Sequence, residues 1–199
     1  MIAHKEEDPH DNTPMIIQWI NKPAETNACM LVVREHHESV FSVSFSPDGS
    51  WFASASKDDS IKIHDGISGE LKLSIQANVG MVRCLSISLS GRRFVAAGLT
   101  GIARVWDVSS GVEVCSLHEM EDTVINACGF SCDGNKLALA GEACQIAVYE
   151  RQGSDWAHVG YCSGGKMFSS LAWHPSDPNI VLAGEGGQAQ KAGGVNCFW

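Results

Sequence analysis

A short pattern that recurs every 42 or 43 residues is the strongest constraint on the fold of this 199-residue chain. The segment FSPDG at residues 45–49 returns as ISLSG at 87–91 and as FSCDG at 130–134, and a looser copy begins with WHPSDP at 173–178. A repeat of this length is a supersecondary unit that buries its apolar surface against copies of itself. We therefore expect an array of about four similar units.

A second marker keeps the same step and indicates what each unit contains. The tripeptide IHD at residues 63–65 becomes VWD at 105–107 and VYE at 148–150. Its central residue follows the start of the first marker by 19 residues in each of these three units. Between the markers, turn residues separate short runs in which apolar and polar residues alternate, which is typical of antiparallel strands. Each unit is predicted to be a four-stranded sheet, and the chain to be all-β.

The first unit shows the expected strands most clearly. Strands are predicted at residues 40–45, 51–56, 61–64 and 71–75. The small residues at 53–56 suit a place where neighbouring sheets approach each other closely. One such sheet cannot bury both of its faces alone, so the units are expected to stack.

With these markers in place, the chain resembles the WD-repeat β-propeller family over residues 15–199, most specifically at TGIARVWDVSSG, residues 100–111. The resemblance implies an incomplete propeller, an arc of about four four-stranded antiparallel sheets, or blades. Ankyrin, tetratricopeptide and armadillo-like arrays need helices that this sequence lacks. The implied organisation is a tail at 1–14, part of a preceding blade at 15–36, and repeats at 37–77, 78–120, 121–163 and 164–199, the last truncated before its outer strand. Strands of the preceding blade are expected at 13–20 and 29–36, and a third strand of the last repeat is expected to end near residue 199.

Four blades are fewer than the seven typical of the family, which leaves three architectures open. The chain is a fragment of a longer propeller, a small four-bladed ring, or an arc that another chain completes. An open arc exposes unpaired strand edges, and closing a ring removes them. This argument favours the fragment.

The resemblance gives the polar residues of the first unit a structural role. In the family, a buried network of His, Ser or Thr, Asp and Trp holds each blade together. The matching residues here are His36, Ser54, Asp58 and, in place of the Trp, His64. The second unit retains Trp106 but has Thr100 where the Asp should be, and the third has Ala143 there. Both units are therefore expected to be more loosely braced.

Three features of the sequence resemble metal-binding or nucleotide-binding sites. One is a set of side chains that could gather around a metal ion: His36, His37, Asp58 and His64. The bracing network accounts for them. Gly160–Lys166 is one residue short of a phosphate-binding loop. Residues 183–189 match the glycine pattern of a dinucleotide-binding turn, but the given sequence ends before the helix, strand and acidic residue that this fold requires. We expect no catalytic residue, metal or cofactor.

The resemblance places partner contacts where the loops before the first strand and after the second strand of each blade gather. The candidates are Phe41, Lys57, Met81, Arg83, Leu99, Val124, Asn126, Glu142 and Met167. Phe41, Met81, Leu99 and Met167 would form an apolar patch there, unless they pack the mouth of the central channel. The glycine-rich stretch at 184–194 is expected to be a mobile loop on the same face.

Charge and cysteine content constrain the partners and the compartment. A formal net charge of −9 argues against nucleic-acid binding. Eight cysteines without a C-x-x-C pair, and no apolar leader or membrane-length run, favour a soluble cytoplasmic protein with reduced thiols, with the nucleus as an alternative. We expect a non-catalytic scaffold that binds proteins and no membrane. The alternative is the propeller part of a larger regulatory or signalling enzyme, and a remote one is a nucleotide-binding enzyme.

Overall fold

The computed structural model describes residues 32–185 and 188–193, which form four antiparallel sheets and, within these ranges, no helix. No helix that could cross a membrane is therefore found in the described part of the chain. Every sheet belongs to the unit formed by residues 33–199. These findings confirm the all-β prediction.

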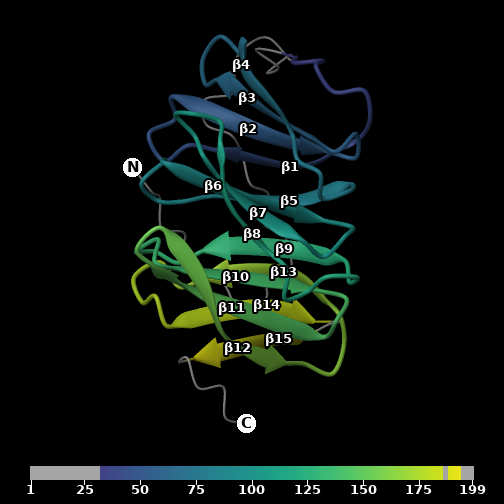
Figure 1. Cartoon of the computed structure of the whole chain (residues 1–199), viewed down its shortest axis with the longest axis vertical. Coiled ribbons are helices and arrows are strands. Elements are labelled where there is room, and N and C mark those ends of the chain that lie inside the picture. The colour runs from purple at the N-terminus through teal and green to yellow at the C-terminus, as the bar shows by residue number, and fades with distance from the viewer. Residues whose placement is uncertain (1–31, 186–187, 194–199) are drawn as a thin grey trace, which may run out of the picture. The chain divides into compact units, whose positions relative to one another are not determined.

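The strands follow one another in chain order within each sheet (Figure 1). The first sheet contains β1 (Val40–Phe45), β2 (Trp51–Ser56), β3 (Ser60–Asp65) and β4 (Leu71–Gln76). The second contains β5 (Val82–Ile87), β6 (Arg93–Gly98), β7 (Ala103–Asp107) and β8 (Glu113–Leu117). The third contains β9 (Ile125–Phe130), β10 (Lys136–Gly141), β11 (Gln145–Gln152) and β12 (Asp155–Ser163). The fourth contains β13 (Phe168–Trp173), β14 (Ile180–Glu185) and β15 (Gln188–Gly193).

A serine closes the turn between the first two strands of three sheets. In the first sheet, the Ser46 hydroxyl donates to the Trp51 carbonyl oxygen at 2.9 Å and accepts from the Trp51 amide at 3.1 Å. One side chain thus satisfies a backbone donor and a backbone acceptor at the point where the ladder ends. The same exchange recurs in the next two sheets, in the pairs Ser88–Arg93 and Ser131–Lys136.

The sheets stack through their first strands. β1 contacts β5, β5 contacts β9, and β9 contacts β13 (Figure 1). The strands β9 and β13 run in the same direction. The Asn126 amide donates to the Phe168 carbonyl oxygen at 3.0 Å near the start of both strands, and the Trp173 indole donates to the Gly129 carbonyl oxygen at 2.8 Å near their ends. Equivalent ends of neighbouring sheets therefore lie at the same side of the stack.

Each seam between two sheets joins unlike faces. We call the face toward the preceding sheet the leading face and the face toward the following sheet the trailing face. Trailing faces carry small and β-branched residues: Ala53, Ala55, Ile61 and Ile63, then Val95, Ala97, Ala103 and Val105, then Ala138, Ala140 and Ile146. Leading faces carry larger and aromatic residues: Leu85, Phe94 and Trp106, then Phe130, Leu137 and Tyr149, then Phe168 and Val181. Bulk on one face fills the space that small residues leave on the other, which gives dense packing.

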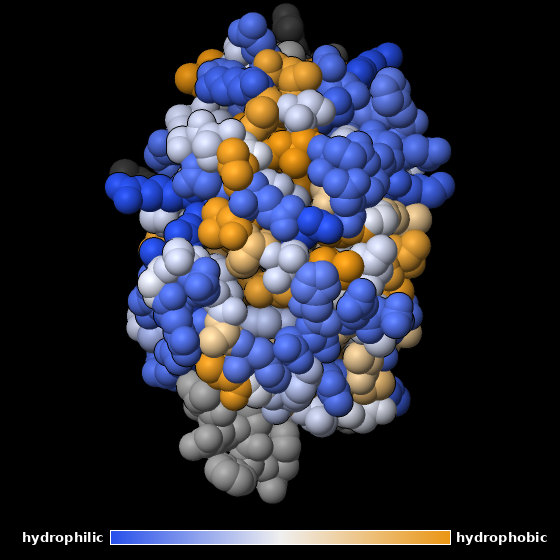
Figure 2. Space-filling view, in the orientation of Figure 1, coloured by the Kyte–Doolittle hydropathy of each residue, from blue (hydrophilic) through white to orange (hydrophobic). Residues whose placement is uncertain are grey.

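Outside the seams, apolar side chains are scattered. Figure 2 shows them as separate patches among hydrophilic residues on the side of the molecule that faces the viewer. Such scattered exposure is ordinary for a folded protein.

Three sequence predictions are wrong. Residues 32–36, the described part of a strand predicted at 29–36, are not in a strand. Much of the loop predicted at 184–194 is instead paired strand, because Gly184 pairs with Ala189 and Glu185 with Gln188. The expectation of reduced thiols holds for five described cysteines, which are free, and fails at Cys162, which is disulfide-bonded; sequence spacing does not reveal pairs that the fold brings together. The strands predicted at 13–20 and near residue 199 lie outside the described residues.

Candidate functional site

One backbone hydrogen bond recurs at the same end of three sheets and holds two loops together. The residue after the second strand donates its amide to the carbonyl oxygen of the residue before the first strand. The pairs are Lys57 with Ser39 at 2.9 Å, Leu99 with Met81 at 3.3 Å and Glu142 with Val124 at 2.9 Å. A Cβ on Gly98 would clash with the Met81 carbonyl oxygen, and one on Gly141 with that of Val124. The absence of a side chain at these glycines lets the loops approach.

The first strand of every sheet carries one extra residue beside this bond. The ladder register shifts between Val40 and Ser42 in the first sheet, and at the equivalent place in the other three. The residues that the shifts skip are Phe41, Arg83, Asn126 and Ser169. A β-bulge of this kind bends the strand and redirects a side chain. Three of these four residues are sequence-predicted partner contacts.

These loops and bulges bring the predicted partner contacts to one end of the sheets. We call this surface the bulge face, and it comprises Phe41, Lys57, Met81, Arg83, Leu99, Val124, Asn126, Glu142 and Met167. Six of the nine residues are exposed: Phe41, Lys57, Arg83, Leu99, Glu142 and Met167. Met81, Val124 and Asn126 are half-buried. The Asn126 amide is occupied by the Phe168 carbonyl oxygen, so this residue links two sheets.

A hydrogen-bonded cluster braces the first sheet from the segment that precedes it. Nδ1 of His36 lies 3.1 Å from Oδ2 of Asp58, and its Nε2 lies 2.8 Å from the Ser54 hydroxyl. The carboxylate also accepts the Ser60 hydroxyl at 2.6 Å and the His37 amide at 3.0 Å. Burial would raise the pKa of Asp58, but the hydrogen bonds from Ser60, His37 and His36 hold it well below its usual value. The ionised carboxylate of Asp58 therefore has a structural role in the first sheet.

His64 lies apart from that cluster. Its ring stacks on Phe52, with ring centroids 4.8 Å apart and planes 18° apart. At the equivalent position of the second sheet, Trp106 stacks on Phe94 at 5.1 Å and 12°. Neither imidazole nitrogen of His64 has a partner with hydrogen-bond geometry. His64 thus takes the packing position of the tryptophan without joining the polar network.

The residues that resembled a metal site and a phosphate-binding loop lie in strands and in the segments that connect them. Within the described residues, no three His, Cys, Asp or Glu side chains are placed to hold a metal ion. The phosphate-loop-like stretch at 160–166 begins within β12, which ends at Ser163, and continues into the connection to β13, so a strand and not a helix follows it.

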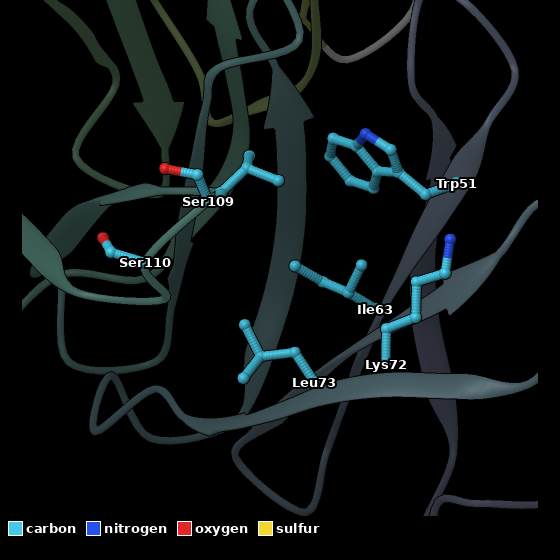
Figure 3. A pocket seen from close by; sticks show the side chains of 7 residues that line it. Trp51, Ile63, Lys72, Leu73, Ser109 and Ser110 are labelled. Atoms are coloured by element: carbon cyan, nitrogen blue, oxygen red, sulfur yellow. The ribbon is translucent and has the colours of Figure 1, made fainter.

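A groove that the sequence did not predict lies at the seam between the first and second sheets (Figure 3). It has a volume of about 270 Å³ and is lined by Trp51, Ile63, Lys72, Leu73, Val108, Ser109 and Ser110. The Lys72 ammonium pairs with Asp65 at 2.9 Å, and the Ser109 hydroxyl donates to Asp107 at 2.6 Å. Its polar groups are therefore engaged at the rim. No sequence signal marks this groove, because it forms only when two repeats meet.

Comparison with known proteins gives the repeats a family. The family model described as WD domain, G-beta repeat matches residues 27–65 and 69–107. Translation initiation factor 3 subunit I of Drosophila willistoni is 22% identical over 167 residues, covering 78% of this chain and 51% of that protein. The same subunit of Nematostella vectensis is 22% identical, with coverage of 79% and 50%. Human apoptotic protease-activating factor 1 is 38% identical over 60 residues, which is 30% of this chain and 5% of that protein.

Solved structures give the same answer for the fold. The crystal structure of the RRP9 WD40 repeats aligns with a TM-score of 0.70 and 18% identity, covering 77% of this chain and 47% of that one. The structure of U3-55K aligns with a TM-score of 0.66 and 16% identity, covering 79% and 53%. The chain spans about half the length of the curated relatives it matches. Residues 27–65 and 69–107 thus match WD repeats, and the four sheets have the fold of WD40 β-propeller blades.

Proposed function

We propose that the chain is a non-catalytic scaffold that binds other proteins through the bulge face. The observation that carries this proposal is the exposure of Phe41, Leu99 and Met167 at the same end of three blades. Their positions depend on backbone bonds and bulges within the sheets, so little conformational freedom is lost when a partner packs against them. Apolar anchors on a rigid frame are typical of protein interfaces.

The relatives support a protein partner. The Drosophila willistoni and Nematostella vectensis relatives are each a subunit of an initiation factor, so they belong to an assembly of several proteins. We propose the same kind of partner for this chain, namely a protein subunit in the cytoplasm. The charged members of the bulge face are of both signs: Lys57 and Arg83 are basic and Glu142 is acidic. Such a surface suits a protein better than the single-sign phosphate backbone of a nucleic acid.

A second function is favoured by the match to apoptotic protease-activating factor 1. That match covers 60 residues and 5% of a much longer protein. By analogy, the blades would be the binding part of a larger regulatory or signalling protein whose catalysis lies outside this chain. Both proposals give the bulge face the same role, and the gene's full reading frame distinguishes them.

The experiment compares two leucines at opposite ends of β6. Leu99 follows the strand on the bulge face, and Leu89 lies in the turn before it; both are exposed. The tagged full chain and its Leu99→Asp and Leu89→Asp variants are used to isolate partners, which are quantified by mass spectrometry. Leu99→Asp should reduce recovery of specific partners about tenfold or more, as expected for a hot-spot residue. Leu89→Asp should leave recovery unchanged. Equal recovery with both variants, or a loss specific to Leu89→Asp, contradicts the proposal.

A further inference from the structure

Two free cysteines face each other across the seam between the second and third blades. Cys84 belongs to β5 and Cys128 to β9, and these two strands contact each other. Both side chains belong to the apolar cluster that fills this seam. Cys84 is buried, and Cys128 is partly exposed. The stacking of the blades therefore brings together two thiols that lie in different repeats.

The two sulfur atoms converge over one strand. The Cys84 thiol donates to the Ala97 carbonyl oxygen at 3.7 Å, and the Cys128 thiol to the Val95 carbonyl oxygen at 3.9 Å. Ala97 and Val95 are two residues apart on β6, so their carbonyl groups point the same way. A hydrogen bond joins the two thiols and, together with burial, raises the pKa of Cys128 well above its usual value. The pair is thus held as neutral thiols in contact.

Packing alone does not require a cysteine at either position. The equivalent ladder positions of the other blades carry small residues in place of Cys84 and branched aliphatic residues in place of Cys128, namely Ser42, Ala127 and Ser170, and Val43, Leu85 and Leu171. Among the seams of the described blades, this one alone sets a thiol opposite a thiol at these positions.

We propose that Cys84 and Cys128 are an oxidation site, at which hydrogen peroxide forms a disulfide bond that fastens the second blade to the third. The Cys128 sulfur attacks one peroxide oxygen, the O–O bond breaks, and the departing hydroxide takes the thiol proton, which gives a sulfenic acid and water. The Cys84 sulfur then attacks the Cys128 sulfur, the S–O bond breaks, and a second water leaves with the Cys84 proton. Two thiols and one peroxide become one disulfide and two waters.

The surroundings of the pair make this reaction slow and its product durable. Peroxide reacts with the thiolate, which is scarce at neutral pH when the pKa of the thiol is raised. A thiol of high pKa is also a poor leaving group, so the finished disulfide resists exchange. The site therefore acts as a lock that closes under sustained oxidation. It lies inside a seam and is independent of the proposed role of the bulge face.

The first test locates the bond. The folded full chain is treated with hydrogen peroxide, the remaining thiols are blocked with N-ethylmaleimide, and the protein is digested with trypsin without a reducing agent. Mass spectrometry should find residues 84–92 joined to residues 105–136, with two hydrogens lost. The second peptide contains Cys115, Cys128 and Cys132, so Cys115→Ser and Cys132→Ser are the matched controls and should keep the link.

Substitution of either partner should abolish the link. Cys84→Ala and Cys128→Leu place at each position a residue that another blade carries there, Ala127 and Leu85, so both variants are expected to fold. Circular dichroism verifies folding, and Cys84→Ser, which copies Ser42 of the first blade, replaces Cys84→Ala if the latter does not fold.

The second test measures stability. Peroxide treatment should raise the urea midpoint of the wild-type protein by about 1–2 M, because a disulfide restricts the unfolded chain. Cys84→Ala should show no such rise under the same treatment. Both proteins contain Cys162, so its disulfide bond does not contribute to the difference.

Three outcomes overturn the proposal. One is a protein in which Cys84 and Cys128 remain free after peroxide has oxidised the other thiols. Another is a link that joins different cysteines, or a mixture of links that is the same when the chain is oxidised in urea, since the fold would then not select the pair. The third is an equal rise of the urea midpoint in the wild-type protein and in Cys84→Ala.

Discussion

At the scale of single residues, Asp58 and His64 are polar side chains in the same part of one blade, but only Asp58 makes hydrogen bonds. Asp58 is ionised and accepts hydrogen bonds from Ser60, His37 and His36. His64 is buried, stacks on Phe52 and makes no hydrogen bond. The sequence resemblance assigned both to one network. It could not separate them, because only the position of the ring in space shows which neighbours its nitrogens meet.

Removing the Asp58 carboxylate should destabilise the protein more than removing the equivalent side chain in the next blade. Asp58→Ala removes the carboxylate that His36, the Ser60 hydroxyl and the His37 amide share, and should cost about 1–3 kcal/mol of unfolding free energy. Thr100→Ala loses a bond to the Val79 carbonyl oxygen and should cost less. Urea denaturation of both variants measures the difference. The reverse order would mean that this cluster does not brace the blade.

His64 should make stability depend on pH. Burial lowers the pKa of His64, outweighing a weak interaction with the Gly69 backbone that raises it. In the unfolded chain this imidazole takes up a proton near pH 6.5, whereas the folded protein resists protonation there. Unfolding therefore binds a proton below about pH 6.5, and the free energy of unfolding falls as the pH decreases, by at most about 1.4 kcal/mol per pH unit.

The matched variant is His64→Phe, which keeps the stack on Phe52 and removes the titrating group. Denaturation curves between pH 7.5 and pH 5 should show a smaller decrease for the variant than for the wild type. Identical slopes would assign the pH dependence to other groups.

At the scale of the elements, the repeat predicted the strands of the first blade and missed what adjusts them. Alternation placed strands at 40–45 and 51–56, where β1 and β2 are found. The bulges at Phe41 and Arg83 have no sequence signature, since an extra residue is visible only against a partner strand. Glycines misled the prediction near Gly184, because a glycine-rich hairpin and a loop have the same composition.

Gly98 should be more sensitive to substitution than a glycine in an open turn. A Cβ at Gly98 meets the Met81 carbonyl oxygen, which accepts the Leu99 amide. Gly98→Ala should therefore destabilise the blade by about 1–3 kcal/mol through overpacking. It should also weaken partner binding, because both loops of the bulge face move. Gly134→Ala, where nothing lies within 4 Å of the new Cβ, should strain only its own turn and leave binding intact. Thermal unfolding and the partner assay measure both effects. Unchanged partner binding by Gly98→Ala would mean that the bond between the two loops is not needed for binding.

At the scale of the whole molecule, the constant 42- or 43-residue step predicted that similar units stack, and the three internal seams show how they do so. Two features at this scale had no sequence signal. The groove at Trp51 and Leu73 needs two repeats in contact, and the exposure of Val40 is evident only beside its buried equivalents Val82, Ile125 and Phe168. Candidate sites that arise between repeats are therefore found by comparing equivalent positions, and not by reading any one repeat.

Because the buried aromatic side chains of every seam lie on the same one of its two faces, the leading face, the stack has a direction. Duplicating one whole repeat in the gene would add one leading face and one trailing face. The number of unmatched ends would stay the same, and each new seam would resemble the old ones. Duplicating part of a repeat would place like against like and leave either a cavity or a clash. Lineages of this chain should therefore change length in steps of whole repeats.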